Sequence, residues 1–302
     1  MDSIGTPGVP WGASERARWR GRQGKRRSYA DEVVTGLERL KRDFDVVPYG
    51  RLEYPPDGSY PLFALKSRAW DDALPLAMVT GGVHGYETSG VHGALLFAQR
   101  DAAAFAGKVN LLIAPCVSPW AYERIHRWNP DAVDPNRSFK ADGAAGEARR
   151  LMEFIAPYRG RFLMHIDLHE TTDSDESEFR PALAARDGKV HEPGEIPDGF
   201  YLVDDAENRQ PGFQDAIIAA VEAVTHIAPP DARGHIIGEK VLSRGVIQYA
   251  VRELGLCASL TGARFTTTTE VYPDSPRVTP AQCNEAQATA VRAGLEYALA
   301  QR

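Results

Sequence analysis

Short apolar runs alternate with segments of helical periodicity along most of this 302-residue chain. Strand-like runs are expected at 45–49, 60–66, 76–80, 109–115, 162–169, 200–203 and 264–271, and helices at 89–103, 145–158, 213–224 and 279–299. Strands that alternate with helices favour a mainly parallel sheet covered by helices on both faces. The alternation therefore predicts an α/β fold, and a chain of this length is long enough to bury the core of one large domain.

Helix-capping signals mark the limits of the predicted domain. A first helix is expected from Ser28, a good N-cap, and the last helix from Thr279, which is followed by proline. Residues 1–27 contain glycine, proline and a run of arginines but no apolar periodicity. We therefore expect a flexible basic tail at 1–27 and a single domain at 28–302. An arm that binds nucleic acid or an acidic partner is the alternative for the tail, but charge runs are usually solvated.

Composition narrows the class of protein. The formal net charge of −6 argues against a general nucleic-acid binder. The three cysteines are widely spaced and form no Cys-x-x-Cys pair, which argues against a thiolate zinc site and a disulfide framework. No apolar stretch is long enough to span a bilayer, and no apolar run follows the basic N-terminal residues. We therefore expect a cytoplasmic protein without nucleic-acid or membrane partners, whose oligomeric state the sequence leaves open.

A histidine and a glutamate stand three residues apart where a predicted strand turns into a predicted helix. His84 and Glu87 follow the run 76–80, after two glycines that allow a sharp turn. Sites in open α/β sheets form at the carboxyl ends of strands. An imidazole and a carboxylate suit zinc, which needs a third protein ligand from elsewhere in the chain. The turn therefore predicts a site for one zinc ion.

The strand predicted at 162–169 offers the third ligand. His165, Asp167 and His169 share one face of that strand because side chains alternate along it. His169 lies at the carboxyl end, where the site is expected, whereas His165 lies deeper and suits a buried core position. We therefore choose His169 as the third ligand and keep His165 as the alternative.

Four motifs in a fixed order resemble the zinc carboxypeptidase family, including its succinylglutamate desuccinylase and aspartoacylase branch. The motifs are His84-x-x-Glu87, Asp134-Pro135-Asn136-Arg137, Asp167-Leu168-His169 and Thr268-Thr269-Glu270. They span roughly residues 75 to 275 and follow the order of the family. The resemblance implies a mixed, mostly parallel eight-stranded sheet flanked by helices, and hydrolysis of an amide bond.

The resemblance also implies catalytic roles outside the metal ligands. Glu270 would be the general base that takes a proton from the attacking water. Arg127, with Arg124 in reserve, would stabilise the negative charge that develops on the scissile carbonyl oxygen. Asp134 would accept a hydrogen bond from the ligand His84 and so orient its ring.

Other residues would bind the substrate. Asn136 and Arg137 would hold its free carboxylate, which the planar guanidinium matches with two hydrogen bonds. Tyr249 would cap the substrate, as a tyrosine upstream of the base does in the family. The acidic run at 170–176 leads into a long surface excursion at 171–198 and is expected to be an exposed loop. The alternative is that it selects a basic substrate or holds a second cation.

Three functions follow from these expectations. The first is a zinc metallocarboxypeptidase that hydrolyses the C-terminal amide bond of a peptide or peptide-like substrate. The second is an N-acyl amino acid deacylase, although the separate C-terminal β domain common in that branch is not seen here. Both would act on a substrate with a free carboxylate. The third is a non-catalytic module that recognises carboxylate termini.

Overall fold

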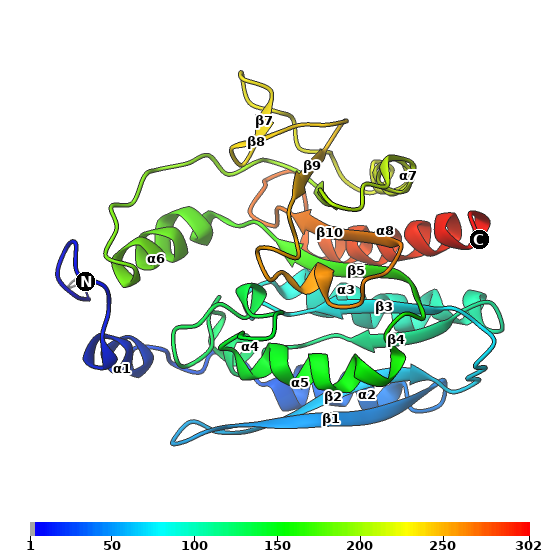
Figure 1. Ribbon diagram of the computed structural model, residues 1–302, viewed down its shortest axis with the longest axis horizontal. Coiled ribbons are helices and arrows are strands. Elements are labelled where there is room, and N and C mark those ends of the chain that lie inside the picture. The colour runs from blue at the N-terminus through cyan, green and yellow to red at the C-terminus, as the bar shows by residue number, and fades with distance from the viewer. Residues whose placement is uncertain (1–3) are drawn as a thin grey trace.

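An eight-stranded sheet runs through the centre of the structure, in the order β1-β2-β4-β3-β5-β10-β6-β9 (Figure 1). The computed structural model describes residues 4–302. The strands are β1 (Phe44–Tyr54), β2 (Gly58–Ser67), β3 (Leu76–Gly81), β4 (Asn110–Ala114), β5 (Phe162–Glu170), β6 (Tyr201–Asp205), β9 (Val246–Tyr249) and β10 (Phe265–Val271). Four of the seven pairings are parallel. The prediction of a mixed, mostly parallel eight-stranded sheet is therefore confirmed.

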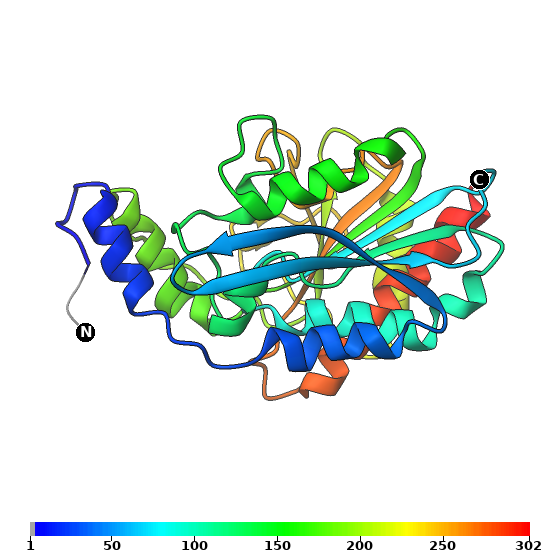
Figure 2. The same ribbon diagram turned by 90° about the horizontal axis from the view of Figure 1, so that it is seen from below.

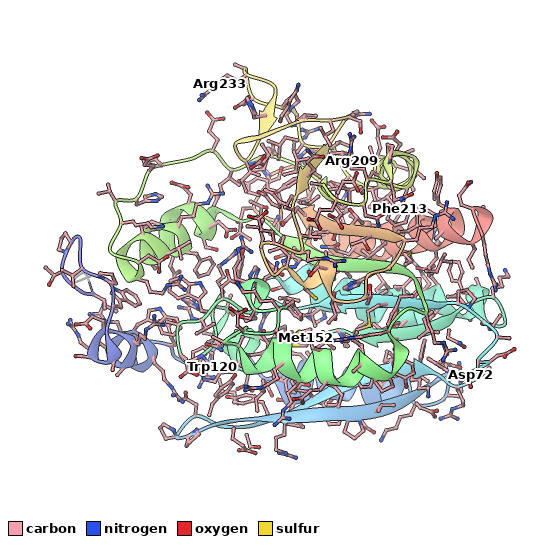
Figure 3. The ribbon with its side chains drawn as sticks, in the orientation of Figure 1. Asp72, Trp120, Met152, Arg209, Phe213 and Arg233 are labelled. Carbon is pink, nitrogen blue, oxygen red and sulfur yellow. The ribbon has the colours of Figure 1, made fainter. Side chains whose placement is uncertain are left out.

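Helices cover both faces of this sheet (Figure 2). The α-helices are α1 (Ala13–Gly21), α2 (Thr35–Arg39), α3 (Thr88–Arg100), α4 (Pro119–Arg124), α5 (Gly146–Ile155), α6 (Arg180–Arg186), α7 (Pro211–Val221) and α8 (Pro280–Ala300). Shorter helical turns are η1 (Ala30–Val34), η2 (Ala102–Phe105), η3 (Pro135–Arg137), η4 (Ala156–Tyr158), η5 (Asp175–Phe179) and η6 (Cys257–Ser259). Helices α2, α3, α7 and α8 pack on one face and α5 on the other, where Met152 packs against the core (Figure 3).

Strand β3 shows why the central strands read as continuous apolar runs. Ala77 and Val79 point into the core under α3 and α8, whereas Leu76 and Met78 point into the core under α5. Every residue of the strand is buried because helices cover both of its faces. The central strands β3, β5 and β10 run parallel, so their carboxyl ends lie at one edge of the sheet.

The N-terminal segment differs from the expected flexible tail. Within the described residues 4–27, α1 is helical, and Trp11 and Trp19 are buried. The ring of Trp19 lies 4.9 Å from that of His126 and 5.6 Å from that of Trp128, between centroids. Two tryptophans therefore anchor the segment to the rest of the fold by aromatic packing. Because they are its main buried apolar residues, the segment shows no helical periodicity, and the sequence did not indicate this contact. Residues 1–3 of the predicted tail lie outside the described part.

The capping predictions agree with the structure. The Ser28 hydroxyl accepts a hydrogen bond from the amide of Asp31 (3.1 Å), although the first turn that follows is π-helical. Thr279 and Gln282 form a reciprocal capping box at the start of α8. These two contacts satisfy amide groups that a helix start leaves without partners.

Several short elements were not predicted. They are α4, α6, strand β9 and a separate hairpin of β7 (His235–Ile236) and β8 (Glu239–Lys240). The surface excursion at 171–198 lies outside the sheet, as expected, but it contains η5 and α6. No helix in the described part of the chain combines the length and apolar character needed to cross a membrane.

Candidate metal centre

Three buried side chains converge where β3 and β5 end. His84 and Glu87 lie in the turn between β3 and α3, and His169 lies at the end of β5. One ligand atom from each lies within 4.8 Å of the other two. Each of these residues is at most 2% exposed. The structure thus brings together the three residues that the sequence predicted as metal ligands.

The orientation of the two rings suits a cation between them. Nδ1 of His84 lies 2.8 Å from Oε1 of Glu87, and Nδ1 of His169 lies 2.7 Å from Oε2. Glu87 Oε2 makes no aligned hydrogen bond although it is fully buried. A buried carboxylate oxygen without a hydrogen bond is costly unless a cation completes its surroundings. Two nitrogen donors and one carboxylate therefore form a donor set that fits a zinc ion.

Carboxylates hold the far side of each ring. Nε2 of His84 lies 2.9 Å from Oδ1 of Asp134, and Nε2 of His169 lies 2.6 Å from Oδ2 of Asp167. Such carboxylate–histidine pairs fix which ring nitrogen faces a metal and raise its basicity. The contact of Asp134 was predicted. The sequence analysis placed Asp167 on the same face of the strand as His169 but did not predict their contact. Residues two apart on a strand point to the same side, so this spacing could have indicated it.

The backbone of the metal-binding turn depends on glycine at two positions. Gly82 has a φ of +59°, which residues with a side chain rarely adopt. A Cβ atom at Gly85 would lie 2.0 Å from the carbonyl carbon of Ala121, so the turn packs directly on the backbone of α4. This close approach places His84 and Glu87 deep in the fold.

The charges of the centre also favour a cation. Burial raises the pKa of Glu87, but His169 and His84 outweigh it and lower this pKa to about 2. Burial lowers the pKa of His169, whereas Asp167 and Glu87 raise it well above its ordinary value. Asp134 is also buried, but Arg127 and His84 hold its pKa well below the usual range. The carboxylates around the two histidines therefore remain ionised and can balance the charge of a bound cation.

Glu270 lies beside the metal-ligand group, at the carboxyl end of β10. It is the register partner of His169 in the parallel pairing of β10 with β5. Oε2 accepts a hydrogen bond from the hydroxyl of Thr171 (2.9 Å), whose own oxygen lies 2.7 Å from the hydroxyl of Tyr201. Burial raises the pKa of Glu270 to about 8; His169 opposes this rise and Glu87 adds to it. A buried carboxyl with a raised pKa facing a cavity has the properties of a general base.

Arg127 lines the cavity, whereas Arg124 does not. Nε of Arg127 donates to Asp134 Oδ2 (3.1 Å), and Nη1 donates to the hydroxyl of Tyr86 (3.2 Å) and to Asp175 Oδ1 (3.3 Å). Arg124 instead donates to the hydroxyl of Tyr60 and stacks on the ring of Trp120. Of the two arginines, only Arg127 is therefore placed to meet a substrate.

The predicted substrate-binding residues lie in the same cavity. Asn136, Arg137 and Tyr249 all line it. Nη1 of Arg137 donates to the carbonyl of Asn136 (2.8 Å), and among the described residues its guanidinium forms no ion pair. The side chain of Asn136 is more constrained, because Oδ1 accepts from the amide of Cys257 (2.7 Å) and Nδ2 lies 3.4 Å from His169 Nε2. The guanidinium of Arg137 thus has donors left for a ligand.

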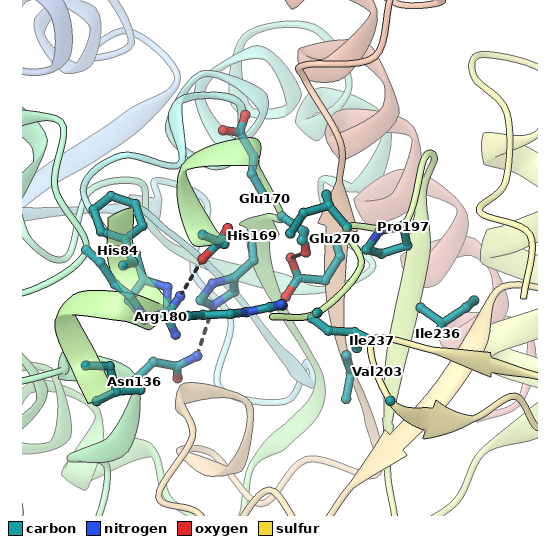
Figure 4. Close-up of a pocket in the computed structure, with 18 of the residues that line it drawn as sticks. His84, Asn136, His169, Glu170, Arg180, Pro197, Val203, Ile236, Ile237 and Glu270 are labelled. Atoms are coloured by element: carbon teal, nitrogen blue, oxygen red, sulfur yellow. Dashed lines mark hydrogen bonds and ion pairs between the residues drawn. The ribbon is translucent and has the colours of Figure 1, made fainter. Parts of the chain in front are cut away.

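The cavity has a volume of about 1550 Å³ and opens at the carboxyl ends of the central strands. Figure 4 shows His84, His169 and Glu270 on its inner side, with Ile236 and Ile237 of the β7–β8 region on the other side. Arg180 of α6 crosses the pocket in front of His169 in the same view. The excursion at 171–198 therefore forms an outer wall of the cavity.

The acidic run after His169 is only partly the exposed loop that we expected: Asp173 is exposed, but Glu170 and Asp175 are buried. Glu170 is 4% exposed, and its carboxylate accepts hydrogen bonds from the amides of Thr88 and Ser89 at the start of α3. Asp175 is 6% exposed and bonds to Tyr86 and Arg127. These carboxylates are therefore buried because they have partners within the fold. The run of acidic residues in the sequence did not indicate which of its carboxylates are buried.

His165, the alternative ligand, lies below the site. Its Nε2 is 3.0 Å from the hydroxyl of Thr80, and that hydroxyl donates to Asp167 Oδ1 (2.6 Å). Burial lowers the pKa of His165 to about 4, which keeps the ring neutral at physiological pH. His165 therefore belongs to the core beneath the metal ligands, as the position deeper in the strand suggested.

Comparisons with known proteins agree with this geometry. A family model of the succinylglutamate desuccinylase/aspartoacylase catalytic domain matches residues 73–195, the segment that contains all three candidate ligands. A search of curated protein sequences found no match.

Solved structures share the fold at low sequence identity. A provisionally named metallopeptidase from Shewanella amazonensis has a TM-score of 0.67 and 20% identity, over 89% of this chain and 91% of that one. A metallo-carboxypeptidase from Burkholderia cenocepacia has a TM-score of 0.62 and 15% identity, over 90% and 69%. Bovine thrombin-activatable fibrinolysis inhibitor has a TM-score of 0.61 and 12% identity, over 93% and 99%. The chain therefore has a metallocarboxypeptidase-like fold, and its segment 73–195 is similar to the succinylglutamate desuccinylase/aspartoacylase catalytic domain.

Proposed function

We propose that the chain is a zinc-dependent metallocarboxypeptidase that hydrolyses the C-terminal amide bond of a peptide-like substrate. The observation that carries the proposal is the buried group of His84, Glu87 and His169, which faces one cavity together with Glu270. Metal ligands, a carboxylate of raised pKa and an arginine without an ion pair are the parts that such a hydrolase needs. The fold and the family model that matches residues 73–195 support hydrolysis as the reaction class.

His84, Glu87 and His169 would hold one zinc ion, which when bound supplies a Lewis acid that activates water and polarises the scissile carbonyl. Glu270 accepts the proton of the attacking water at its carboxylate. Thr171 orients that carboxylate by its hydrogen bond to Oε2. The same group, once protonated, donates the proton to the leaving amine. The raised pKa of Glu270 suits both halves of this transfer.

Two arginines would bind two oxygen-bearing groups of the substrate: the carbonyl of the scissile bond and the terminal carboxylate. Arg127 is held by Asp134 and Asp175, so its remaining donors are already directed into the cavity when charge develops on the carbonyl oxygen. Arg137 binds the terminal carboxylate of the substrate through its planar guanidinium. Tyr249 closes over the bound residue from the end of β9.

The size of the cavity favours a peptide over a single acylated amino acid. Sites for small molecules usually measure about 300–1,000 Å³. The cavity here is larger, at about 1550 Å³, because α6 and the β7–β8 hairpin extend its walls away from the metal ligands. This larger volume leaves room for several residues on the N-terminal side of the scissile bond.

A second candidate function is hydrolysis of N-acyl amino acids. The observation that favours it is the family model of the succinylglutamate desuccinylase/aspartoacylase catalytic domain, which matches residues 73–195. Both reactions cleave an amide beside a free carboxylate, so they use the same metal ligands, base and clamp. They differ in what occupies the outer part of the cavity.

Substrate choice separates the two functions. Zinc-loaded protein is incubated with a tetrapeptide series and with the N-acetyl and N-succinyl derivatives of the same C-terminal amino acids, and release of the free amino acid is measured. A carboxypeptidase prefers the tetrapeptides by kcat/KM. A preference for the acylated amino acids would overturn our choice in favour of the deacylase. Zinc binding without release from either class would indicate a non-catalytic binding module.

A further inference from the structure

Arg27, in the N-terminal segment that was expected to be flexible, reaches the metal-binding turn. Its guanidinium donates three short hydrogen bonds: Nε to the carbonyl of Tyr122 (2.7 Å), Nη1 to the hydroxyl of Thr88 (2.8 Å) and Nη2 to the carbonyl of Gly85 (2.6 Å). The guanidinium carbon also lies 3.5 Å from the ring centroid of Tyr122. Each nitrogen of the guanidinium thus donates one hydrogen bond, which a lysine ammonium could not do in the same planar arrangement.

Two of these partners flank a metal ligand. Gly85 and Thr88 stand on either side of Glu87, and Gly85 directly follows His84. The turn from 82 to 87 has no regular secondary structure, so ladder hydrogen bonds do not fix it. Ser118 holds the first half of the turn, where its amide donates to Gly82 O (2.9 Å) and its hydroxyl to Val83 O (2.7 Å). In the second half the amide of Tyr86 bonds to His126 O at 3.1 Å and the amide of Glu87 lies 3.4 Å from His84 O, so the bond from Arg27 to Gly85 O is shorter than these backbone contacts.

Arg27 is itself held in place by the body of the protein. The amides of Arg26 and Arg27 donate to the carbonyl of Glu123 (2.7 and 3.2 Å). The carboxylate of Glu123 is buried and accepts from the amide of Tyr29 and from the ammonium of Lys25. The backbone that carries Arg27 is therefore fixed on both sides, and its side chain can act as a rigid connection to the turn.

We propose that Arg27 is a positioning residue for the metal centre, which fixes the spacing of His84 and Glu87 by bridging Gly85 and Thr88. This inference rests on the metal centre of the proposed function but not on its substrate. Residues that orient metal ligands without touching the metal typically change metal affinity by about 10–100-fold when they are removed. Arg27 acts on the backbone of the turn rather than on a ligand ring.

The test measures zinc affinity in full-length protein. The variants are Arg27→Ala, Arg27→Lys and the neighbouring control Arg26→Ala, whose side chain is exposed. Zinc dissociation constants come from equilibrium competition with a chromophoric chelator, and the visible spectrum of the Co²⁺-substituted protein reports the geometry of the ligands. We expect Arg27→Ala to weaken zinc binding about 10–100-fold and to alter the Co²⁺ spectrum. Arg27→Lys should restore part of the affinity, and Arg26→Ala should match the wild type.

A second control separates positioning from general loosening of the N-terminal segment. Lys25→Ala removes an ion pair with Glu123 in the same segment but no contact to the turn. Thermal unfolding of each metal-free variant is measured alongside. Wild-type zinc affinity and an unchanged Co²⁺ spectrum in Arg27→Ala would overturn the inference, as would an equal loss in Lys25→Ala. A wild-type protein that binds no zinc would instead refute the proposed metal centre itself.

Discussion

Replacement of Glu270 by glutamine removes the proposed base while keeping the shape of the side chain. Thr171 donates its hydroxyl hydrogen to Oε2 of Glu270, and the amide oxygen of a glutamine can accept the same bond. Glu270 also lies outside the group of three metal ligands. The substitution therefore leaves the fold and the metal centre in place and changes only the ability to accept a proton.

The size of the effect follows from the role. A positioned general base contributes about 10²–10⁴-fold to the rate, which corresponds to about 3–5 kcal/mol of activation free energy. Glu270 is the carboxylate that serves this role in our proposal, because Glu87 binds the metal and Glu170 caps α3. We therefore expect kcat of Glu270→Gln to fall by at least about 10²-fold.

The assay compares this variant with a matched control. Glu195→Gln makes the same chemical change on the exposed rim of the same cavity. Peptide hydrolysis is followed by release of the C-terminal amino acid, and zinc content is measured in each preparation. We expect a large loss of kcat only in Glu270→Gln, with zinc retained in both. Activity of Glu270→Gln within tenfold of the wild type, at full zinc occupancy, would remove Glu270 from the mechanism.

Three further predictions concern the clamp, the metal ligands and pH. Replacement of Arg137 by alanine should raise KM by about 10–100-fold for peptides with a free carboxylate, with a smaller effect on kcat, because it removes charge-assisted hydrogen bonds; unchanged kinetics with these peptides would contradict the clamp. Asp167→Asn should weaken zinc binding by about 10–100-fold in chelator competition, because it loosens His169; unchanged affinity would show that the contact is not needed. In the metal-free protein, burial raises the pKa of Glu270 from 4.5 to about 8, so the folded state keeps a proton that the unfolded state releases. Stability from this group should fall as pH rises through that window, and Glu270→Gln should melt above the wild type at pH 9 but not at pH 4; parallel melting curves at both pH values would refute it.

The sequence could predict the parts of the fold that lie between covering helices. Strands β3, β5 and β10 are buried on both faces and therefore appear as apolar or Thr-rich runs. Parallel pairing then brings their carboxyl ends together, so His84, Glu87 and His169 meet although the chain separates them widely. Strand β9 has four residues and only its first two are buried, so it leaves no such pattern.

Contacts made by long loops could not be predicted in the same way. Arg127 meets Asp175 across 48 positions of sequence, and nothing in either local pattern indicates the pairing. The acidic run that contains Asp175 looked like a solvated loop because the sequence does not show which of its carboxylates find partners. The N-terminal arginines were also interpreted as solvated, yet Arg27 lies against the metal-binding turn. In each case the partner comes from a distant segment that only the folded chain brings close.

The most direct test of the proposed function is the reaction itself. Zinc-loaded and chelator-stripped protein would each be incubated with a pool of free peptides, C-terminally amidated peptides and N-acyl amino acids, with products identified by mass spectrometry. Our proposal predicts loss of single C-terminal residues from free peptides only, and only with zinc present. Cleavage of amidated peptides to the same extent, or equal turnover without metal, would contradict it.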